Sequence, residues 1–437
     1  MSLGGYAVPH GDDMMDEEPD MTTQTELLDD RPAEDVDFTD PSFLAAPWQP
    51  LLKLGDRNPV FWSDLQQAWI VTRHADVKAG YSDARLSAER AEIYLRTAPP
   101  NAELICPTAI RIAKLHVGFL DGPDHMRIRT LMMKAFTRSV VESFRAHTVA
   151  TIEELLAAAP KGEPFDLVGT ITSRLPARVL QRILGVSVEE AEEFFEHAQS
   201  IVEVLASVRP NVEDLERFES ATIRLNQMFE ALMLERERLP TDDLLSHYVN
   251  ARDNLERLSH DETLAACHQT IVAGTETTAH FLAVGLAEIA RSKDLTSLIR
   301  SEPGAEKRIV DELLRYPSLV KGLIRIARVD FEWHGQAIKA GDVLFLMNIS
   351  ANTDPEIFED PFTINPNRDC RSSLSFAPGF HHCIGHLLAR MELEEFYSRV
   401  LNAYDLTILE NDPKFVDNFV FRGYKRLMIQ LDPRTQL

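Results

Sequence analysis

Residues 376–385 read Phe-Ala-Pro-Gly-Phe-His-His-Cys-Ile-Gly, and this short segment constrains the architecture of the chain more than any other. Its proline and glycines predict a loop that delivers Cys383 to the first turn of a helix starting near Ile384. Unpaired backbone N–H groups and the partial positive charge of a helix N-terminus both favour thiolate over thiol. Gly379 and Gly385 let the backbone lie close to a flat ligand, because neither carries a Cβ atom.

The segment has three possible interpretations, and two of them are a small buried cysteine and a zinc site. A lone cysteine beside a glycine is usually a small core residue. His381, His382, Cys383 and His386 are zinc ligands by residue type, although their separations match no standard zinc finger. The ten-residue pattern as a whole favours a third reading, in which Cys383 is an axial thiolate ligand of heme iron.

A long apolar segment, residues 259–292, predicts one helix buried in the middle of the protein. Ser259 and Glu262 have the Ser-x-x-Glu spacing of a capping box, and the residues that follow are apolar on most sides of the helix. A charged Glu276 within such a helix costs several kcal/mol unless it has a partner or a function. This cost makes the middle of the segment a candidate site.

The neighbours of Glu276 add to this expectation. Thr277 lies four residues after Ala273, so its hydroxyl competes for the Ala273 carbonyl and opens the helix locally. Gly274 leaves room for a diatomic ligand near the iron. Together these features predict an oxygen pocket with a proton route. The alternative is a structural Glu276 that pairs with a lysine or with His280, one helical turn further on.

The rest of the chain alternates helical and β patterns and predicts a mainly helical protein. Residues 60–62 and 68–72 are short apolar runs typical of paired strands. The stretch 84–118 is long, irregular and broken by prolines, which is typical of a functional loop. The other expected elements are helices within 125–239, a helix over 306–316, strands over 324–329 and 343–347, a loop-rich region over 351–382 and a final helix past Glu395.

Composition narrows the function classes. The chain has 437 residues, with 45 Lys+Arg against 69 Asp+Glu, and its net charge of −24 argues against nucleic acid as a partner. No run approaches ~18 apolar residues, so no membrane span is expected. Four scattered cysteines without a CxxC pair argue against a disulfide framework and predict a reducing, cytoplasmic compartment.

Charge also marks the N-terminal end. Residues 1–40 hold 13 acidic residues against Arg31, which gives −12 of the total −24. Such a segment predicts an acidic, disordered tail, followed by a single domain over residues 41–437. Residues 1–15 have no basic start and no apolar run, so no signal peptide is expected. Met21 is an alternative start.

Three motifs in order carry a resemblance to the cytochrome P450 superfamily. Residues 376–385 resemble its heme-ligand signature, Phe-x-x-Gly-x-His-x-Cys-x-Gly. Residues 273–278, Ala-Gly-Thr-Glu-Thr-Thr, resemble its oxygen-activation motif, and residues 312–315, Glu-Leu-Leu-Arg, match its Glu-x-x-Arg helix. Weaker likenesses at 124–129 and 352–355 extend the match from about residue 59 to 431. The likeness is to bacterial, soluble members that depend on a ferredoxin.

The resemblance implies a fold and a cofactor. The fold is mainly α with a small β portion, shaped like a triangular prism, with the heme between the long central helix and the helix after the cysteine loop. The cofactor is heme b (iron protoporphyrin IX), with Cys383 as the metal ligand. The implied cofactor-binding residues are His125, Arg129, Ala273, Arg325, Phe376, His381, Cys383 and Gly385. Of these, His125, Arg129, Arg325 and His381 hold the propionates.

The resemblance also assigns roles to other residues. Glu276 and Thr277 are the catalytic pair that delivers protons so that the O–O bond breaks heterolytically. Glu312 and Arg315 form a structural ion-pair network with Arg368, which supports the loop before the cysteine. One departure concerns Ala377, where many bacterial members have glycine, and Pro378, which lacks a backbone donor and makes the redox potential of this site uncertain.

The last expectations concern the proteins that donate electrons and the pocket that binds substrate. The sequence has no flavin domain and no cysteine set for an iron–sulfur cluster, so the resemblance implies a separate ferredoxin and ferredoxin reductase. A basic patch near the cysteine is one hypothesis for their docking, and scattered solvated charges are the alternative; the patch would comprise Arg127, Lys134, Arg138 and Arg390. The expected substrate pocket is apolar and is lined by the loop 84–118 and by Val272, Leu323, Ile324, Phe419, Val420 and Phe421.

These expectations describe a monomeric heme-thiolate monooxygenase that inserts one atom of O₂ into a hydrophobic small molecule, by hydroxylation or epoxidation, in secondary metabolism or catabolism. Terpenoid, fatty acid, steroid and polyketide substrates all remain open. Two alternatives are a peroxide-driven heme-thiolate oxygenase, against which the Glu276–Thr277 pair argues, and a non-catalytic heme or ligand-binding protein.

Overall fold

The computed structural model describes residues 37–38, 40–90, 98–206, 210–253, 256–416, 418 and 420–434. The expected acidic tail over residues 1–40 falls almost entirely outside these described residues.

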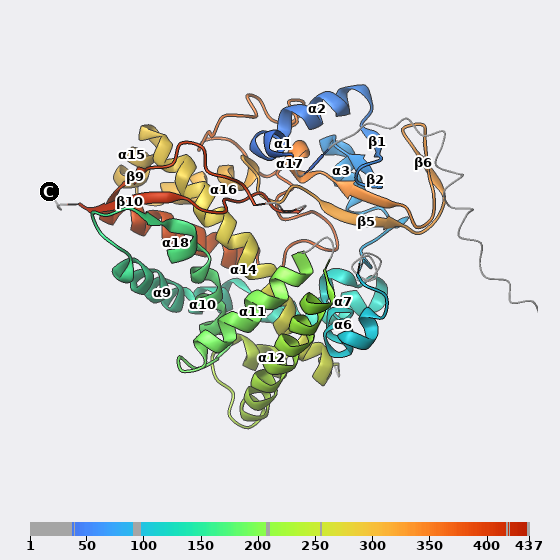
Figure 1. The fold of residues 1–437 in the computed structure, drawn as a ribbon, viewed down its shortest axis with the longest axis horizontal. Coiled ribbons are helices and arrows are strands. Elements are labelled where there is room, and N and C mark those ends of the chain that lie inside the picture. The colour runs from blue at the N-terminus through green and yellow to red at the C-terminus, as the bar shows by residue number, and fades with distance from the viewer. Residues whose placement is uncertain are drawn as a thin grey trace, which may run out of the picture.

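Helices make up most of the described chain (Figure 1). In chain order they are α1 Pro41–Ala45, α2 Trp48–Arg57, α3 His74–Gly80, α5 Ala102–Ile105, α6 Pro107–Ala113, η2 Val117–Phe119, α7 Gly122–Met133, η3 Lys134–Phe136, α8 Arg138–Ser143, α9 Arg145–Ala158, η4 Val168–Thr172, α10 Arg174–Ile183, α11 Ala191–Ala206, α12 Val212–Arg238, α13 Leu244–Asn250, α14 His260–Arg291, α15 Lys293–Ser301, α16 Ala305–Arg315, α17 Asn348–Ala351 and α18 His386–Ala403.

The strands form small sheets within the described residues. Their bounds are β1 Val60–Ser63, β2 Ala68–Val71, β3 Leu86–Ser87, β4 Phe165–Asp166, β5 Leu323–Ala327, β6 Phe331–Trp333, β7 Gln336–Ile338, β8 Val343–Leu346, β9 Tyr404–Ile408 and β10 Met428–Pro433. The largest sheet has the order β1-β2-β8-β5-β3, and the others are β4-β10-β9 and β6-β7. Figure 1 places the largest sheet beside α1, α2 and α3, away from β9 and β10.

The expected strand pair at residues 60–72 is confirmed. β1 and β2 are antiparallel, with Trp62 opposite Trp69, and β2 continues into the sheet by pairing in parallel with β8. All residues of β1 and β2 are buried, which explains why the sequence reads as continuous apolar runs rather than as an alternation. The expected strands near 324 and 343 are also present, as β5 and β8.

Helix α14 is the centre of the helical part, as the sequence predicts. Its capping box is present, because Ser259 Oγ accepts from the Glu262 N–H and the Glu262 carboxylate accepts from the Ser259 N–H. Helices α6, α10, α11, α15 and α18 all contact α14, and in Figure 1 it lies at the middle of the molecule. The mainly helical fold with small sheets is therefore confirmed.

The stretch 84–118 differs from the expected loop. Its described part contains β3 and two short helices, α5 and α6. Pro107 does not break this region, because it is the first residue of α6, where a missing N–H costs nothing. Helix α6 packs against α12 and α14, so this segment forms one wall of the helical part.

Candidate functional site

Backbone hydrogen bonds close the turn that carries Cys383. The Cys383 N–H donates to the Phe376 carbonyl over 2.9 Å, and the His382 N–H donates to the Gly379 carbonyl over 3.2 Å. Ala377 and Gly379 have φ angles of 49° and 83°, so both lie in the left-handed region, and Ala377 adopts a conformation that favours glycine. The turn leaves Cys383 half-buried just before α18.

The position of Cys383 relative to α18 differs from the expectation. Helix α18 begins at His386 with Gly385 as its N-cap, so Cys383 precedes the first turn. Burial raises the pKa of the Cys383 thiol to about 11, while the Gly385 N–H and the Arg129 charge act in the opposite direction. The expected preference for thiolate is therefore not provided by the polypeptide alone. A metal at the sulfur would supply it, because coordination removes the thiol proton.

The two glycines of the turn have different reasons to be glycine. A Cβ atom at Gly385 would meet no atom within 4 Å, so open space adjoins the backbone where a flat ligand is expected. Gly379 instead has a positive φ, and its Cβ would lie 2.8 Å from Ser82 Oγ and 3.1 Å from the Tyr81 carbonyl oxygen. Gly379 therefore serves the fold of the turn rather than the approach of a ligand.

Open space also adjoins the middle of α14. Ala273 is exposed although it lies halfway along a helix whose other residues are mostly buried. Gly274 does not provide this space, contrary to the expectation, because its Cβ would lie 3.0 Å from Leu180 Cδ1 of α10. This glycine lets α10 pack closely on α14.

The two polar residues of the α14 motif have identifiable contacts. Thr277 Oγ1 donates to the Ala273 carbonyl over 2.6 Å as expected, but α14 stays continuous there and the expected local opening is absent. Glu276 is half-buried, and its Oε1 accepts from Asn418 Nδ2 over 3.2 Å. His280 Nε2 lies 3.5 Å from the same oxygen. The pairing of Glu276 with His280, raised as an alternative from the sequence, is thus present.

A cluster of basic side chains lies beside the Cys383 turn. The rings of His125 and His381 stack with their centroids 4.0 Å apart. Arg129 Nη2 donates to the His382 carbonyl, and Arg325 Nη1 donates to the Ile324 carbonyl over 2.9 Å. The four residues assigned to the propionates are therefore brought together, from α7, β5 and the turn.

Two polar atoms of this cluster have no hydrogen-bond partner among the described residues. His125 Nε2 and Arg325 Nη2 are buried and make no hydrogen bond among the described residues. Burial, followed by the charge of His381, lowers the pKa of His125 to about 4, and burial lowers the pKa of Arg325 to about 10. Buried polar nitrogens without partners are costly, and an anion bound at this cluster would accept from Arg325 Nη2 and from His125 Nε2 in its protonated tautomer. The residues present therefore fit the two propionates of heme.

Asp121 joins this cluster, and the sequence analysis missed it. Its carboxylate lies 3.4 Å from His381 Nε2 and accepts from Ser87 Oγ over 2.6 Å and from Arg328 Nη2 over 2.6 Å. Although burial acts to raise it, these hydrogen bonds hold the pKa of Asp121 well below its usual range. The signal in the sequence was an aspartate directly before the helix α7. In the structure this side chain makes no capping bond to α7, so it is free to bond elsewhere.

An ion-pair network with a fully buried Glu312–Arg315 pair lies behind the Cys383 loop. Arg315 Nε and Nη2 donate to the two Glu312 carboxylate oxygens over 2.8 and 2.7 Å, and Arg368 Nε donates to Glu312 Oε1 over 2.8 Å. The Asn365 N–H donates to the same oxygen over 3.0 Å. Arg315 also donates to three backbone carbonyls, those of Asn352, Pro361 and Thr363. The network therefore ties the segment 352–368 to α16.

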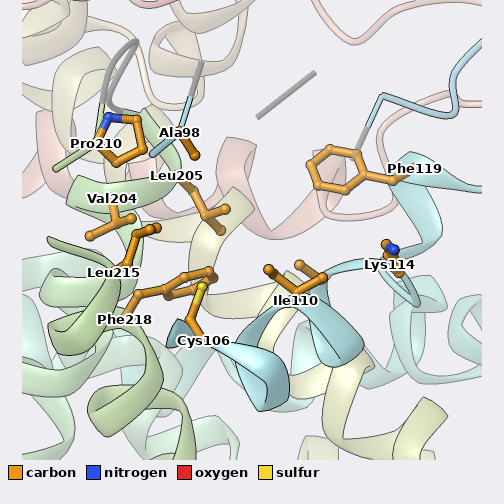
Figure 2. A pocket seen from close by; sticks show the side chains of 11 residues that line it. Ala98, Cys106, Ile110, Lys114, Phe119, Val204, Leu205, Pro210, Leu215 and Phe218 are labelled. Carbon is orange, nitrogen blue, oxygen red and sulfur yellow. The ribbon is translucent and has the colours of Figure 1, made fainter. Parts of the chain in front are cut away.

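A pocket opens between the segment 98–119 and helices α11 and α12 (Figure 2). Its lining is apolar apart from the Cys106 thiol and Lys114. Figure 2 shows side chains of α11 and α12 on one side and those of α6 and the residues after it across from them. The lining residues are Ala98, Cys106, Ile110, Ala113, Lys114, Phe119, Val204, Leu205, Pro210, Leu215 and Phe218.

The residues expected to contact substrate lie elsewhere. Val272 is half-buried on α14, and Leu323 and Ile324 are half-buried on β5. Val420 and Phe421 are half-buried beside residues 319–321, and Phe419 lies outside the described residues. None of the described members of this set lines the pocket of Figure 2. The sequence pattern pointed to the segment 84–118 as a wall of the pocket, but not to α11 and α12.

Among the residues that the structure describes, no helix is both long enough and apolar enough to cross a bilayer.

Comparisons with known proteins agree with the geometry. A family model described as Cytochrome P450 matches residues 107–304 and 307–431. Epothilone C/D epoxidase of Sorangium cellulosum is 29% identical over 414 residues, which cover 94% of this chain and 98% of that protein. Steroid C26-monooxygenase of Mycobacterium tuberculosis is 32% identical over 322 residues, which cover 73% of this chain and 86% of that protein. The crystal structure of epothilone D-bound cytochrome P450epoK has a TM-score of 0.83 at 28% identity and covers 92% of this chain and 100% of its own.

Replacing Glu312 by glutamine should lower the free energy of unfolding by about 3–5 kcal/mol, because Arg315 and Arg368 then lack their buried counter-charge. Glu302→Gln is the matched control, since its exposed pair with Arg308 should be worth at most ~1 kcal/mol. Urea denaturation of both variants measures the difference, and equal losses would contradict the assigned role.

The Glu312→Gln variant and the wild type should also differ in how their stability changes in acid. Although burial acts to raise it, hydrogen bonds from Arg315, Asn365 and Arg368 hold the pKa of Glu312 below its ordinary value. The carboxylate therefore contributes stability above its unfolded-state pKa, and this contribution is lost as pH falls through its folded-state pKa. Glu312→Gln should lose less stability on acidification than the wild type.

Proposed function

The chain belongs to the cytochrome P450 family and is a monooxygenase of that family, and we propose that it inserts one oxygen atom of O₂ into a hydrophobic small molecule, by hydroxylation or epoxidation. The proposal rests first on the cluster of basic side chains beside Cys383. Its two buried nitrogens without partners, the neutral His125 Nε2 and the charged Arg325 Nη2, match the need of heme propionates for hydrogen-bond donors and positive charge.

Heme b is the proposed cofactor, and the sulfur of Cys383 would bind its iron. When bound through a thiolate, heme supplies the activation of O₂ that oxygen insertion requires. The open space at Gly385 and at Ala273 supports a flat group between the Cys383 turn and α14. Phe376 borders this turn, with its ring centroid 5.9 Å from that of His386 and the Arg390 guanidinium 5.2 Å over it.

Glu276 and Thr277 are the proposed proton-delivery pair. Glu276 is half-buried and bonded through Oε1, so its carboxylate is held in place while its other oxygen exchanges protons. The Thr277 hydroxyl lies next to exposed Ala273 and donates to its carbonyl. Its oxygen still has lone pairs to accept a proton or a hydrogen bond, which suits a group that passes protons to the oxygen site.

Thr277→Ala should reduce the ratio of product formed to NAD(P)H consumed by at least tenfold, because one step of general acid catalysis is lost. Thr275→Ala is the matched control, since its hydroxyl makes the same kind of bond to the Ile271 carbonyl but is buried. The ratio is measured with a ferredoxin system and a substrate found by spectral-shift screening of hydrophobic compounds.

Unchanged coupling in Thr277→Ala would contradict the proton-delivery role. Equal turnover of wild type and variant with hydrogen peroxide alone, at the rate supported by NAD(P)H, would instead favour the peroxide-driven alternative.

The pocket of Figure 2 supports a hydrophobic substrate, because its lining is mostly aliphatic and aromatic. According to their names, two relatives act on an epothilone and on a steroid. We propose that the substrate enters between α6 and helices α11 and α12. Lys114 at the pocket is already paired with Glu103 over 3.3 Å, so no charged group of the substrate is called for at this position.

A ferredoxin and its reductase are the proposed electron donors, docking on the face outside Cys383. The expected basic patch is weaker than the sequence suggests, because three of its four members pair with acids. Those pairs are Arg127 with Glu262, Lys134 with Asp253, and Arg390 with Asp311.

Arg138 is exposed without an ion pair among the described residues, and Phe380 and Met126 are 66% and 60% exposed. Met126 follows His125 along the chain and Phe380 precedes His381, and the rings of these two histidines stack. We therefore propose an apolar contact at the centre of the docking face, with Arg138 supplying charge.

Phe380→Ala should slow reduction by ferredoxin about fivefold, the effect of losing ~1 kcal/mol of interface contact. Arg138→Glu should slow it at low salt and weaken its salt dependence. Stopped-flow measurements with ferredoxin, compared with dithionite, separate docking from damage to the site. Leu104→Ala, at another exposed apolar residue, is the control, and equal rates in all variants would exclude this face.

A further inference from the structure

A histidine lies behind the proposed proton-delivery carboxylate. His280 is one turn after Glu276 on α14, and its Nε2 is 3.5 Å from Glu276 Oε1. The side chain of His280 is 11% exposed, and its Nε2 makes no hydrogen bond among the described residues. A buried polar nitrogen without a bond is costly, and the group that it faces is this carboxylate.

The ring of His280 is held in place by residues 421–423. A Cβ atom at Gly423 would lie 2.0 Å from His280 Nδ1, so only glycine admits the ring here. The ring of Phe421 is 6.4 Å away, centroid to centroid. His280 therefore cannot withdraw from Glu276 toward this segment.

The chain just before these residues supplies the second contact to the carboxylate. Asn418 Nδ2 donates to Glu276 Oε1 over 3.2 Å, and the Asn418 carbonyl accepts from the buried Lys321 Nζ over 2.7 Å. The Arg422 N–H donates to the Leu319 carbonyl over 2.8 Å, which fixes the segment to the chain before β5. Glu276 Oε1 thus faces two groups, Asn418 Nδ2 and His280 Nε2.

We propose that His280 is a positioning residue for Glu276, which acts with Asn418 to hold Oε1 and so leaves Oε2 as the oxygen that carries the proton. In each cycle Oε2 takes one proton from solvent and releases it toward Thr277, which returns the carboxylate to its ionised form without any transfer of electrons. This inference rests on the proposed function of the Glu276–Thr277 pair and assigns a role to a residue outside it.

Three variants separate positioning from packing. His280→Gln keeps an N–H donor at the reach of Nε2, His280→Leu keeps volume but removes the donor, and Gly423→Ala pushes the ring without changing either polar residue. The ratio of product to NAD(P)H consumed should fall about fivefold in His280→Leu, because the contact between Nε2 and Glu276 Oε1 over 3.5 Å is lost. His280→Gln should retain most of the coupling, and Gly423→Ala should resemble His280→Leu.

The solvent isotope effect on product formation provides a readout that packing does not move. It should rise in His280→Leu, because a misplaced Oε2 makes proton transfer slower, and should stay at the wild-type value in His280→Gln. Equal losses in the Gln and Leu variants, with an unchanged isotope effect, would show that the ring only fills space and would overturn the proposal.

A double-mutant cycle tests the contact without turnover. Urea unfolding of Glu276→Gln, His280→Leu and the double variant should give non-additive changes, whereas additive changes would exclude a direct interaction. If Thr277→Ala uncouples the enzyme but His280→Leu does not, this proposal falls and the proposed function stands. If neither uncouples it, both fall.

Discussion

Glu312 provides the electrostatic anchor on which the arrangement at Cys383 depends. Its buried carboxylate accepts from Arg315, from Arg368 and from the backbone of Asn365, so the irregular segment before the cysteine is fixed at points far apart in sequence. Loops of this length lose their shape readily, because no regular ladder holds them. Because the segment is fixed at α16, the short turn that follows it holds the Cys383 sulfur in a defined place. The polar groups of the network are buried because they hold the loop that carries this sulfur.

The anchored turn faces a cluster that is complete only with an anion. His125 Nε2 and Arg325 Nη2 each forgo a hydrogen bond at a cost of about 1–3 kcal/mol, while Asp121 keeps His381 in position. Such unfavourable local contributions to the free energy of folding are found in proteins at sites where a bound ligand offsets them. On the other side, exposed Ala273 and bonded Glu276 lie on the central helix α14. In the proposed function, cofactor binding, proton delivery and electron entry belong to separate elements: the cluster beside Cys383, α14 and the face around Phe380.

Much of this arrangement was predictable because each local signal agreed with the fold. The capping box of α14, the pairing of β1 with β2 and the motif around Cys383 all follow from spacing along the chain. The start of α18 at His386 and the roles of Gly274 and Gly379 were not predictable in this way. The sequence shows that a residue is glycine, but it does not show whether that glycine allows a close contact or a positive φ. The pocket wall from α11 and α12 was also missed, since only packing brings those helices to the segment 98–119. Asp121 was overlooked because its partners are 34 and 207 residues away.

The central claim is that the Cys383 sulfur binds heme iron, and the absorption spectrum of the reduced protein with carbon monoxide tests it most directly. Heme-loaded wild type should give the long-wavelength Soret band of thiolate ligation, and so should Cys370→Ala, which removes the other half-buried cysteine. Cys383→Ala should lose this band. Its absence from the wild type, or its persistence in Cys383→Ala, would contradict the account.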